Sequence, residues 1–264
     1  MSDTIIVIPA RYGSTRFPGK PLSIIAGKTL LQHVCEAATK AAQQLPNVTV
    51  LVATDDDRIM QHASSINIKA ILTPTSCATG TDRAYAALQA LDYKPRNVIN
   101  LQGDAPLTPP AIIIALIQAL EHNNVVTPVT QLSWQDLDRL RQAKLKHPFS
   151  GTTVILDSSY EAMWFSKNII PAIRNEAKLR EANMISPIFQ HLGIYGYTYE
   201  MLATFTSMLE GKYERLEGLE QLRLLENGYK IKAVPASSEN LHCWSGVDTP
   251  ADAEFINHLL SGNI

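Results

Sequence analysis

The segment Pro9–Leu22 holds the residues best suited to bind a polyphosphate. It carries three cations, Arg11, Arg16 and Lys20, together with two glycines that allow close backbone approach. The segment follows a strand-like apolar run and precedes a helical pattern, and open α/β sheets bind ligands beyond the carboxyl ends of their strands. Its backbone N–H groups and cations can together surround an anion. A charge run is more often a solvated loop, but this placement favours a polyphosphate site.

Two well-known phosphate-binding motifs do not describe this segment. A P-loop has the form G-x-x-x-x-G-K-[ST], but Gly13 and Gly19 have one residue too many between them, and Pro21 follows Lys20. The G-x-G-x-x-G pattern of dinucleotide-binding folds is also absent here. The segment is therefore predicted to bind phosphates in another way.

Two carboxylates that are distant in sequence form a candidate metal site. Asp104 follows the apolar run Val98–Leu101, and Asp248 stands just before a predicted C-terminal helix. Mg²⁺ prefers hard oxygen ligands and can bridge such carboxylates to nucleotide phosphates. Asp248 could instead cap the helix, but Thr249 can supply that cap. The sequence therefore predicts that Asp104 and Asp248 hold Mg²⁺ as a pair.

A third candidate is the run His191–Thr198, in which His191 and Tyr195 are four residues apart. On a single strand this even spacing places both side chains on one face. A lone histidine beside apolar residues is more often part of the core, so the spacing alone assigns no function.

The elements that must position these residues alternate between β-branched runs and helical patterns in the first half of the chain. Strands are expected at Thr4–Ile8, Val48–Ala53, Ile68–Leu72 and Val98–Leu101. Helices are expected at Lys28–Leu45, after a cap in Asp55–Asp57, at Asp82–Leu91, and from Thr108 as N-cap with Pro109 as first residue to about His122. Apolar strands alternating with helices predict a parallel sheet covered on both faces.

The second half of the chain is less regular. Strands are expected at Val125–Leu132, Thr152–Leu156, His191–Thr198 and Ile231–Ala236. Leu216–Asn227 is predicted to be one helix that ends before Gly228. In the run Tyr213–Arg223, Leu216, Leu219 and Leu222 are expected in the core and the charged side chains in solvent. A capping box at Thr249 opens the last helix, and the polar segment Arg174–Ser186 is predicted to be a mobile loop or lid. The chain is thus expected to form one continuous α/β domain with an embedded accessory lobe.

Composition excludes several classes of protein. The 264 residues carry a formal net charge of −2, so no overall positive field attracts nucleic acid or anionic lipid. Three scattered cysteines indicate neither a disulfide framework nor a structural zinc site. The apolar run Ala111–Ile117 is too short to cross a bilayer, and the N-terminus lacks the pattern of a signal peptide. A cytoplasmic protein without nucleic-acid partners or membrane insertion is expected.

Seven motifs occur in one order along the chain. They are P-A-R-x-x-S-T-R-x-P-G-K-P-L from Pro9, V-A-T-D from Val52, G-T-D-R from Gly80, Q-G-D-x-P from Gln102, H-L-G-I-Y-G-Y from His191, L-E-Q-L-R from Leu219 and G-V-D-T-P from Gly246. In this combination the chain resembles the 3-deoxy-manno-octulosonate cytidylyltransferase (CMP-Kdo synthetase) family over residues 5–255. The first loop alone would indicate only a nucleotidyltransferase, and the motifs at His191 and Leu219 narrow the resemblance to the Kdo type.

The resemblance implies a Rossmann-like nucleotide-diphospho-sugar transferase fold with a mostly parallel central sheet and an embedded accessory and dimerisation lobe. It implies a homodimer that transfers CMP from CTP to a 3-deoxy-2-ulosonic acid (Kdo or a close variant such as 8-amino-Kdo), releasing pyrophosphate, with Mg²⁺, for lipopolysaccharide biosynthesis. Within one domain, residues 1–264, the nucleotide-binding half would span about 1–125. The acceptor and dimerisation segments would span about 126–245, before a closing helix at 250–260.

The resemblance also implies roles for individual residues. The catalytic residues would be Arg11, Lys20 and Asp104. The nucleotide would be bound by Pro9, Ala10, Arg11, Ser14, Arg16, Lys20, Thr81, Asp82 and Arg83. The sugar acid would be bound by Gln102, Lys167, His191, Tyr195, Glu220 and Gln221. The Mg²⁺ ligands would be Asp104 and Asp248.

Three positions depart from the family pattern and raise the question of the acceptor. Ala105 stands where glutamate is usual, Lys167 where arginine is usual and Thr152 where lysine is usual. Lysine lacks the planar fork with which arginine binds a carboxylate. We hypothesise that CTP binding is retained and that acceptor recognition is altered. Two alternatives stay open: a cytidylyltransferase for a different nonulosonic or ulosonic acid, and a non-catalytic nucleotide-binding paralogue.

Overall fold

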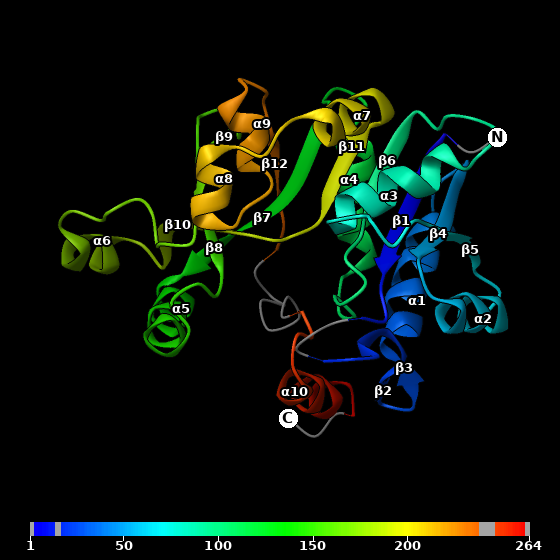
Figure 1. Ribbon diagram of the computed structural model, residues 1–264. Coiled ribbons are helices and arrows are strands. Elements are labelled where there is room, and N and C mark those ends of the chain that lie inside the picture. The colour runs from blue at the N-terminus through cyan, green and yellow to red at the C-terminus, as the bar shows by residue number, and fades with distance from the viewer. Residues whose placement is uncertain (1–2, 14–16, 238–245, 262–264) are drawn as a thin grey trace.

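The computed structural model describes residues 3–13, 17–237 and 246–261. A ten-stranded mixed sheet forms its centre, in the order β5-β4-β1-β6-β11-β7-β10-β8-β9 with β12 beside β7 (Figure 1). The four strands of the parallel part are β1 (Thr4–Ala10), β4 (Val48–Thr54), β5 (Lys69–Leu72) and β6 (Asn97–Asn100). The remaining strands of this sheet are β7 (Val125–Ser133), β8 (Thr152–Leu156), β9 (Ala162–Ser166), β10 (Ile185–His191), β11 (Tyr195–Thr198) and β12 (Lys232–Pro235).

The sheet is covered on both faces, because β1 and its neighbours alternate buried side chains between two cores. Ile5 and Val7 pack in one core with residues of α3 (Gly80–Gln89), α7 (Tyr199–Ser207) and α9 (Leu222–Glu226). Ile6 and Ile8 pack in the other with α1 (Leu30–Ala42), α2 (Asp57–Ser65) and α4 (Pro110–Ala119). The predicted α/β fold with helices on both faces is confirmed.

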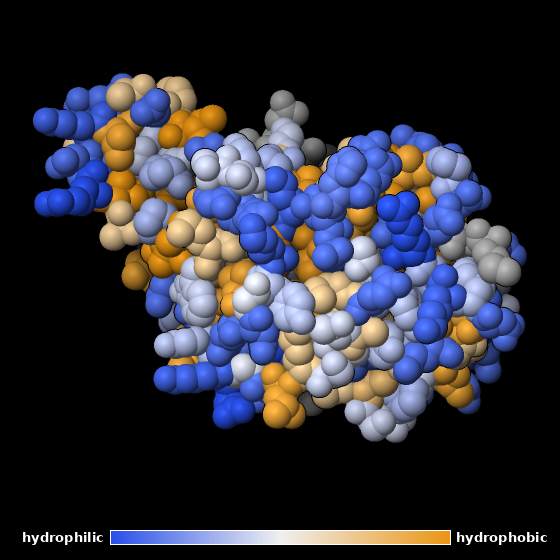
Figure 2. Space-filling view, turned by 90° about the horizontal axis from the view of Figure 1, so that it is seen from above, coloured by the Kyte–Doolittle hydropathy of each residue, from blue (hydrophilic) through white to orange (hydrophobic). Residues whose placement is uncertain are grey.

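A lobe formed by α5 (Trp134–Lys146) and α6 (Glu176–Ala182) lies at the opposite end of the molecule from β5 and α2 (Figure 1). Figure 2 shows apolar side chains among hydrophilic ones on this lobe, and the exposed apolar residues there include Leu145, Phe149 and Met184. The segment Arg174–Ser186, predicted to be a mobile loop or lid, is not a continuous loop, since it contains α6 and the start of β10. Arg141 of α5 binds Glu176 of α6 through two hydrogen bonds of 2.8 Å.

The last helix, α10 (Pro250–Leu260), packs beside a small hairpin of β2 (Ile24–Ile25) and β3 (Lys28–Thr29) (Figure 1). Buried Val247 and Ile256 contact Ile25 and Leu30 in a separate apolar cluster. The predicted capping box at Thr249 and the bounds of this helix are confirmed. The hairpin takes the first residues of the predicted helix Lys28–Leu45, so that helix begins at Leu30.

Two other predicted elements are divided in the structure. The strand predicted at His191–Thr198 is wrong, since β10 ends at His191 and β11 begins at Tyr195. Between them the N–H of Leu192 donates to the carbonyl of Pro128 of β7 (3.1 Å). At this point the chain crosses from one edge of β7 to the other. The strands β10 and β11 therefore pair with opposite edges of β7.

The predicted helix Leu216–Asn227 is also wrong. It is replaced by α8 (Lys212–Glu217) and α9, because Gly218 has a φ of +63° and ends the first helix. Leu216 is 70% exposed rather than in the core, while Leu219 and Leu222 are buried as predicted. The C′ role of Gly228 is consistent with its φ of +77°.

The predicted N-cap at Thr108 is wrong as well. Pro109 is the N-cap of α4, and the hydroxyl of Thr108 donates to the carbonyl of Ala105 (3.0 Å). Thr108 thus closes the turn that follows Asp104. Among the described residues, no helix has both the length and the apolar composition needed to cross a bilayer.

Candidate functional site

The candidate site lies where β1, β4 and β6 end at the same edge of the sheet. Ala10 pairs with Thr54 at the ends of β1 and β4, and the N–H of Leu101 donates to the carbonyl of Val7 (2.9 Å) just beyond β6. Gly103 then approaches β1 closely, since a Cβ atom on it would lie 2.5 Å from the carbonyl oxygen of Pro9. Only glycine permits this contact, which places Asp104 directly beside the end of β1.

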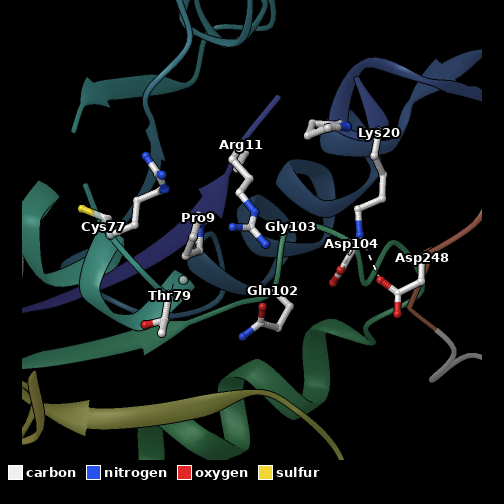
Figure 3. Close-up of a pocket in the computed structure, with 13 residues that line it drawn as sticks. Pro9, Arg11, Lys20, Cys77, Thr79, Gln102, Gly103, Asp104 and Asp248 are labelled. Carbon is white, nitrogen blue, oxygen red and sulfur yellow. Dashed lines mark hydrogen bonds and ion pairs between the residues drawn. The ribbon is translucent and has the colours of Figure 1, made fainter. Parts of the chain in front are cut away.

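A pocket of about 270 Å³ opens at this edge. It is lined by Pro9, Ala10, Arg11, Lys20, Pro21, Cys77, Thr79, Gly80, Arg83, Gln102, Gly103, Asp104 and Asp248. Figure 3 shows Cys77 and Thr79 at one end of the pocket, the Lys20–Asp104–Asp248 cluster at the other, and Arg11 between them. The pocket therefore brings cations and carboxylates from four distant parts of the chain into one volume.

Lys20 lies at the centre of the charged end of the pocket. Its ammonium Nζ lies 2.8 Å from Asp104 Oδ2 and 3.3 Å from Asp248 Oδ1 (Figure 3). The two carboxylates meet because the N–H of Val247 donates to the carbonyl of Asp104 (2.8 Å). Thr249 caps α10, as the sequence analysis expects, and Asp248 is directed to Lys20 instead.

The two carboxylates fit the ligand preference of Mg²⁺, because both offer hard oxygen atoms around one point. Among the described residues no group of three or more His, Cys, Asp or Glu could hold a metal ion. Mg²⁺ usually keeps several waters and is bound through one or two carboxylates plus substrate phosphates. The donor set of Asp104 and Asp248 therefore suits a metal that arrives with a phosphate ligand.

The loop that precedes Lys20 is closed at its base. The N–H of Gly19 donates to the carbonyl of Tyr12 (3.0 Å), and Gly19 has a φ of +72° that favours glycine. The guanidinium of Arg58 on α2 stacks on the Tyr12 ring at 3.3 Å from its centroid. These contacts fix both ends of the loop next to the pocket. The predicted ligands Ser14 and Arg16 lie outside the described residues.

The predicted nucleotide residues on α3 have different surroundings. Arg83 lines the pocket but is only 3% exposed, and its guanidinium binds Asp55 (2.8 Å) and Thr73 (2.7 Å). Asp82 accepts from the N–H of Thr79 (3.1 Å) in a capping box, and Thr81 is buried. Neither Thr81 nor Asp82 lines the pocket.

Sequence reasoning missed Cys77 and Thr79, which line the pocket. The capping-box spacing of Thr79 and Asp82 could have placed the start of α3 at Gly80 and Thr79 at the pocket. Burial raises the pKa of the Cys77 thiol, so Cys77 is suited to pack against a ligand rather than to react with it. No pattern in the sequence distinguishes Cys77 from an ordinary loop residue.

A second polar cluster surrounds His191 at the end of β10. Its Nε2 lies 2.9 Å from the hydroxyl of Thr127, which itself donates to the carbonyl of Ile194 (2.8 Å), so Nε2 is the donor. The His191 ring packs against Phe165 at 5.0 Å and Tyr195 at 5.4 Å between centroids. Burial, together with the nearby charge of Lys167, lowers the pKa of His191 to about 3, so the ring is neutral.

The predicted acceptor residues Lys167, His191 and Tyr195 therefore lie together, although not on one strand. Burial lowers the pKa of Lys167 and raises that of Tyr195. Thr152 pairs opposite His191 in the register of β8 and β10. Thus two of the three positions that depart from the family pattern, Thr152 and Lys167, lie near His191. The third, Ala105, lies in the turn after Asp104.

Glu220 connects this cluster with the nucleotide half. Its Oε2 accepts from the hydroxyl of Thr81 (2.8 Å), and that hydroxyl accepts from the side-chain amide of Asn100 (3.2 Å). Burial raises the pKa of Glu220. Gln221 is 5% exposed, and its side-chain Nε2 has no hydrogen-bond partner among the described residues. Gln102 lines the pocket that contains Lys20 and Asp104.

Comparison with known proteins gives closely related sequences over the whole chain. Residues 5–231 match the family model described as cytidylyltransferase. The chain is 39% identical over 261 residues to the 3-deoxy-manno-octulosonate cytidylyltransferase of Maricaulis maris, covering 97% of this chain and 96% of that protein. It is 39% identical over 262 residues to the 8-amino-3,8-dideoxy-manno-octulosonate cytidylyltransferase of Shewanella putrefaciens, covering 99% and 100%.

Solved structures show the same similarity. The structure of a CMP:2-keto-3-deoxy-manno-octonic acid synthetase complexed with CTP superposes with a TM-score of 0.83 at 34% identity, over 100% of both chains. A 4-diphosphocytidyl-2C-methyl-D-erythritolsynthase from Anaerococcus prevotii shares the fold, with a TM-score of 0.61 at 15% identity over 98% of this chain and 96% of that one.

Proposed function

The chain belongs to the cytidylyltransferase family and is a CTP-dependent nucleotidyltransferase, and we propose that its acceptor is a 3-deoxy-2-ulosonic acid, Kdo or 8-amino-Kdo. The observation that carries the proposal is the joint placement of Arg11, Lys20, Asp104 and Asp248 in one pocket. Glu220 links the two regions, because its charge acts on Tyr195 of the His191 cluster and its carboxylate binds Thr81, the residue after Gly80 in the pocket wall. Full-length similarity to enzymes named for both acids supports this choice of acceptor.

The cations of the pocket suit a triphosphate. Arg11 and Lys20, which both line the pocket, would neutralise phosphate oxygens. The wall formed by Cys77, Thr79 and Gly80 would face the nucleoside. Arg83, which is paired with Asp55, would act through this wall rather than as a mobile phosphate ligand.

We propose Mg²⁺ as the cofactor, with Asp104 and Asp248 as its protein ligands. Bound there, Mg²⁺ would neutralise charge on the phosphates and favour the ionised form of the attacking hydroxyl. Lys20 would then turn from the carboxylates to the phosphates, since its present partners would be bound to the metal.

The reaction needs the anomeric hydroxyl of the acid to attack the α-phosphorus of CTP in line. A bond forms between that oxygen and the α-phosphorus, the bond to the bridging oxygen of pyrophosphate breaks, and the hydroxyl proton is released. Arg11 and Lys20 would stabilise the charge that develops on the leaving pyrophosphate. Positioning and electrostatics supply most of the rate enhancement in such transfers.

The His191 cluster suits the acceptor. The ammonium of Lys167 would neutralise the carboxylate of the sugar acid, while Gln102, Tyr195, Glu220 and Gln221 would bind its hydroxyl groups. Neutral His191 would donate or accept without adding a charge. The side-chain Nε2 of Gln221, which has no partner in the described part of the chain, supports this assignment, because buried polar groups generally have a partner and a sugar hydroxyl would supply one.

Homodimer formation, a cytoplasmic location and a role in lipopolysaccharide biosynthesis complete the proposal. The similarity to Kdo-type enzymes supports all three. Light scattering coupled to size-exclusion chromatography would give the mass of the particle. A mass of one chain over the working concentration range would contradict the dimer.

The decisive experiment measures pyrophosphate release from CTP with a panel of acids and Mg²⁺. Kdo or 8-amino-Kdo is expected to support turnover, and the ratio of kcat/KM between them would identify the preferred acceptor. Preferred turnover of another nonulosonic acid would contradict the proposed acceptor. Binding of CTP without turnover of any acid would favour the non-catalytic alternative.

A further inference from the structure

Glu217, the last residue of α8, binds the end of β9. Its Oε1 accepts from the hydroxyl of Ser166 (2.8 Å), and its Oε2 accepts from the backbone N–H of Lys167 (2.8 Å). Ser166 is 4% exposed, so this contact is shielded from water. The two carboxylate oxygens therefore hold the consecutive residues Ser166 and Lys167 at the proposed acceptor site.

Lys144 of α5 holds the same residue from the other side. Its ammonium donates to the carbonyl of Lys167 (2.5 Å), to the carbonyl of Gly151 (3.0 Å) and to the carbonyl of Ser150. The backbone of Lys167 is thus bound at its N–H by α8 and at its carbonyl by α5. This leaves its side chain as the part that can respond to a ligand.

The charge around Lys167 supports this assignment. Burial and repulsion from Lys167 both lower the pKa of His191, so the ammonium lies close enough to act on the ring electrostatically. Burial lowers the pKa of Lys167 itself, and the Glu217 carboxylate opposes that shift. Glu217 therefore holds the backbone and also favours the charged form of the side chain.

The turn after Glu217 carries two further acceptor residues. Gly218 has a φ of +63°, and the chain then presents Glu220 to Thr81 and buries Gln221 before α9 begins. Two residues, Gly218 and Leu219, thus separate Glu217, which contacts β9, from Glu220, which contacts α3. A shift of Glu217 away from β9 would move Glu220 relative to Lys167.

The helices on both sides of this turn are joined by a buried ion pair. Arg223 of α9 binds Glu214 of α8 through two hydrogen bonds of 2.8 and 2.5 Å, and their side chains are 12% and 6% exposed. Glu214 also accepts from the N–H of Gly211 (2.8 Å). Because this buried pair joins α8 to α9, the contact that Glu217 makes orients the two helices toward β9 together with the edge-on contact of the Trp164 and Tyr213 rings (5.3 Å between centroids).

We propose that Glu217 is a positioning residue for the acceptor, one that fixes the spacing between Lys167 on β9 and the Glu220–Gln221 turn. It does not touch the reacting atoms. Its loss would weaken binding of the sugar acid while leaving the CTP pocket, which is built by β1, β6 and α3, unchanged. The inference rests on the proposed function.

The test is steady-state kinetics of Glu217→Gln with the acid that the wild-type protein uses. The glutamine amide can still accept from the N–H of Lys167 and can donate to the hydroxyl of Ser166, but it has no negative charge to strengthen these bonds or to favour the charged form of Lys167. The KM for the acid is expected to rise about tenfold and the KM for CTP to change less than about twofold. Ser166→Ala should raise the KM for the acid less, and should add less in the Glu217→Gln background than it does alone.

Glu210→Gln is the matched control, because Glu210 makes an exposed ion pair with Arg215 (2.9 Å) near the start of α8. It should leave both KM values unchanged. If the wild-type protein is active and Glu217→Gln leaves the KM for the acid unchanged, the inference is overturned and the proposed function stands. Equal losses for acid and CTP would show a general structural role and would also overturn it. A wild-type protein inactive with every acid would overturn the proposed function and the inference together.

Discussion

The ammonium of Lys20 lies 2.8 Å from the carboxylate of Asp104, in the position where a divalent metal would compete for the same oxygens. Asp248 contributes a second oxygen at 3.3 Å from this ammonium. Lys20 is 13% exposed, so the cluster is partly shielded from solvent screening. The protein thus supplies an internal cation for two carboxylates that, without it, would repel one another.

We predict that Lys20→Met binds Mn²⁺ (as a probe for Mg²⁺) more tightly than the wild-type protein when CTP is absent. The variant removes the cation that competes for Asp104 and Asp248, so affinity should rise several-fold, roughly 1 kcal/mol. Turnover should fall at least about 100-fold, because the triphosphate loses a cation. Electron paramagnetic resonance titration of free Mn²⁺ measures the first effect, with Lys69→Met on an exposed part of β5 as control. An unchanged Mn²⁺ affinity would refute the competition.

We predict that Asp104→Asn and Asp248→Asn each lower kcat for pyrophosphate release by about 100-fold or more while retaining CTP binding. Each variant removes one negative charge from the proposed metal site. Removing one group that stabilises the charge developing in a transition state typically lowers kcat by about 100-fold or more. Chelation with EDTA should abolish turnover of the wild-type protein, and added Mg²⁺ should restore it. The exposed Asp92→Asn serves as control. Full activity in EDTA would exclude a metal.

The pocket that contains Arg11, Lys20 and Asp104 could be predicted from sequence because its residues follow directly from local elements. Asp104 comes after the end of a short buried strand, and parallel strands end at one edge, so its place beside Arg11 and Lys20 follows from the alternation of strands and helices. The sequence also predicts that Asp248 lies beside Asp104, as the structure shows. Its physical cause, the hydrogen bond from Val247 to Asp104, became visible only in the structure.

The acceptor side could not be predicted in the same way, because long-range contacts fix its geometry. The crossing of β7 between His191 and Tyr195 depends on the bond from Leu192 to Pro128. The break between α8 and α9 depends on Gly218 and on the buried Glu214–Arg223 pair. The leucine spacing instead predicts that these two charged side chains lie in solvent. The spacing of hydrophobic residues in the sequence indicates neither of these long-range contacts.

We predict that Arg83→Met lowers the free energy of unfolding by about 3 kcal/mol, because it leaves Asp55 partly buried without its cation and Thr73 without its donor. Urea unfolding monitored by circular dichroism measures this change. Arg215→Met, which breaks an exposed pair with Glu210, should cost less than about 1 kcal/mol. Equal effects of the two variants would contradict the structural role given to Arg83.

We predict that His191 makes stability depend on pH. Its pKa is about 3 in the folded protein, against an ordinary value of 6.5, so the unfolded chain binds one more proton between these values. The free energy of unfolding therefore rises with pH across this window, by up to about 1.4 kcal/mol per pH unit from this residue, and levels off above it. Urea unfolding between about pH 4.5 and pH 7.5 should give a smaller slope for His191→Gln than for the wild-type protein. The other histidines contribute to both slopes and cancel in the difference, so two equal slopes would show that His191 is not held neutral by burial.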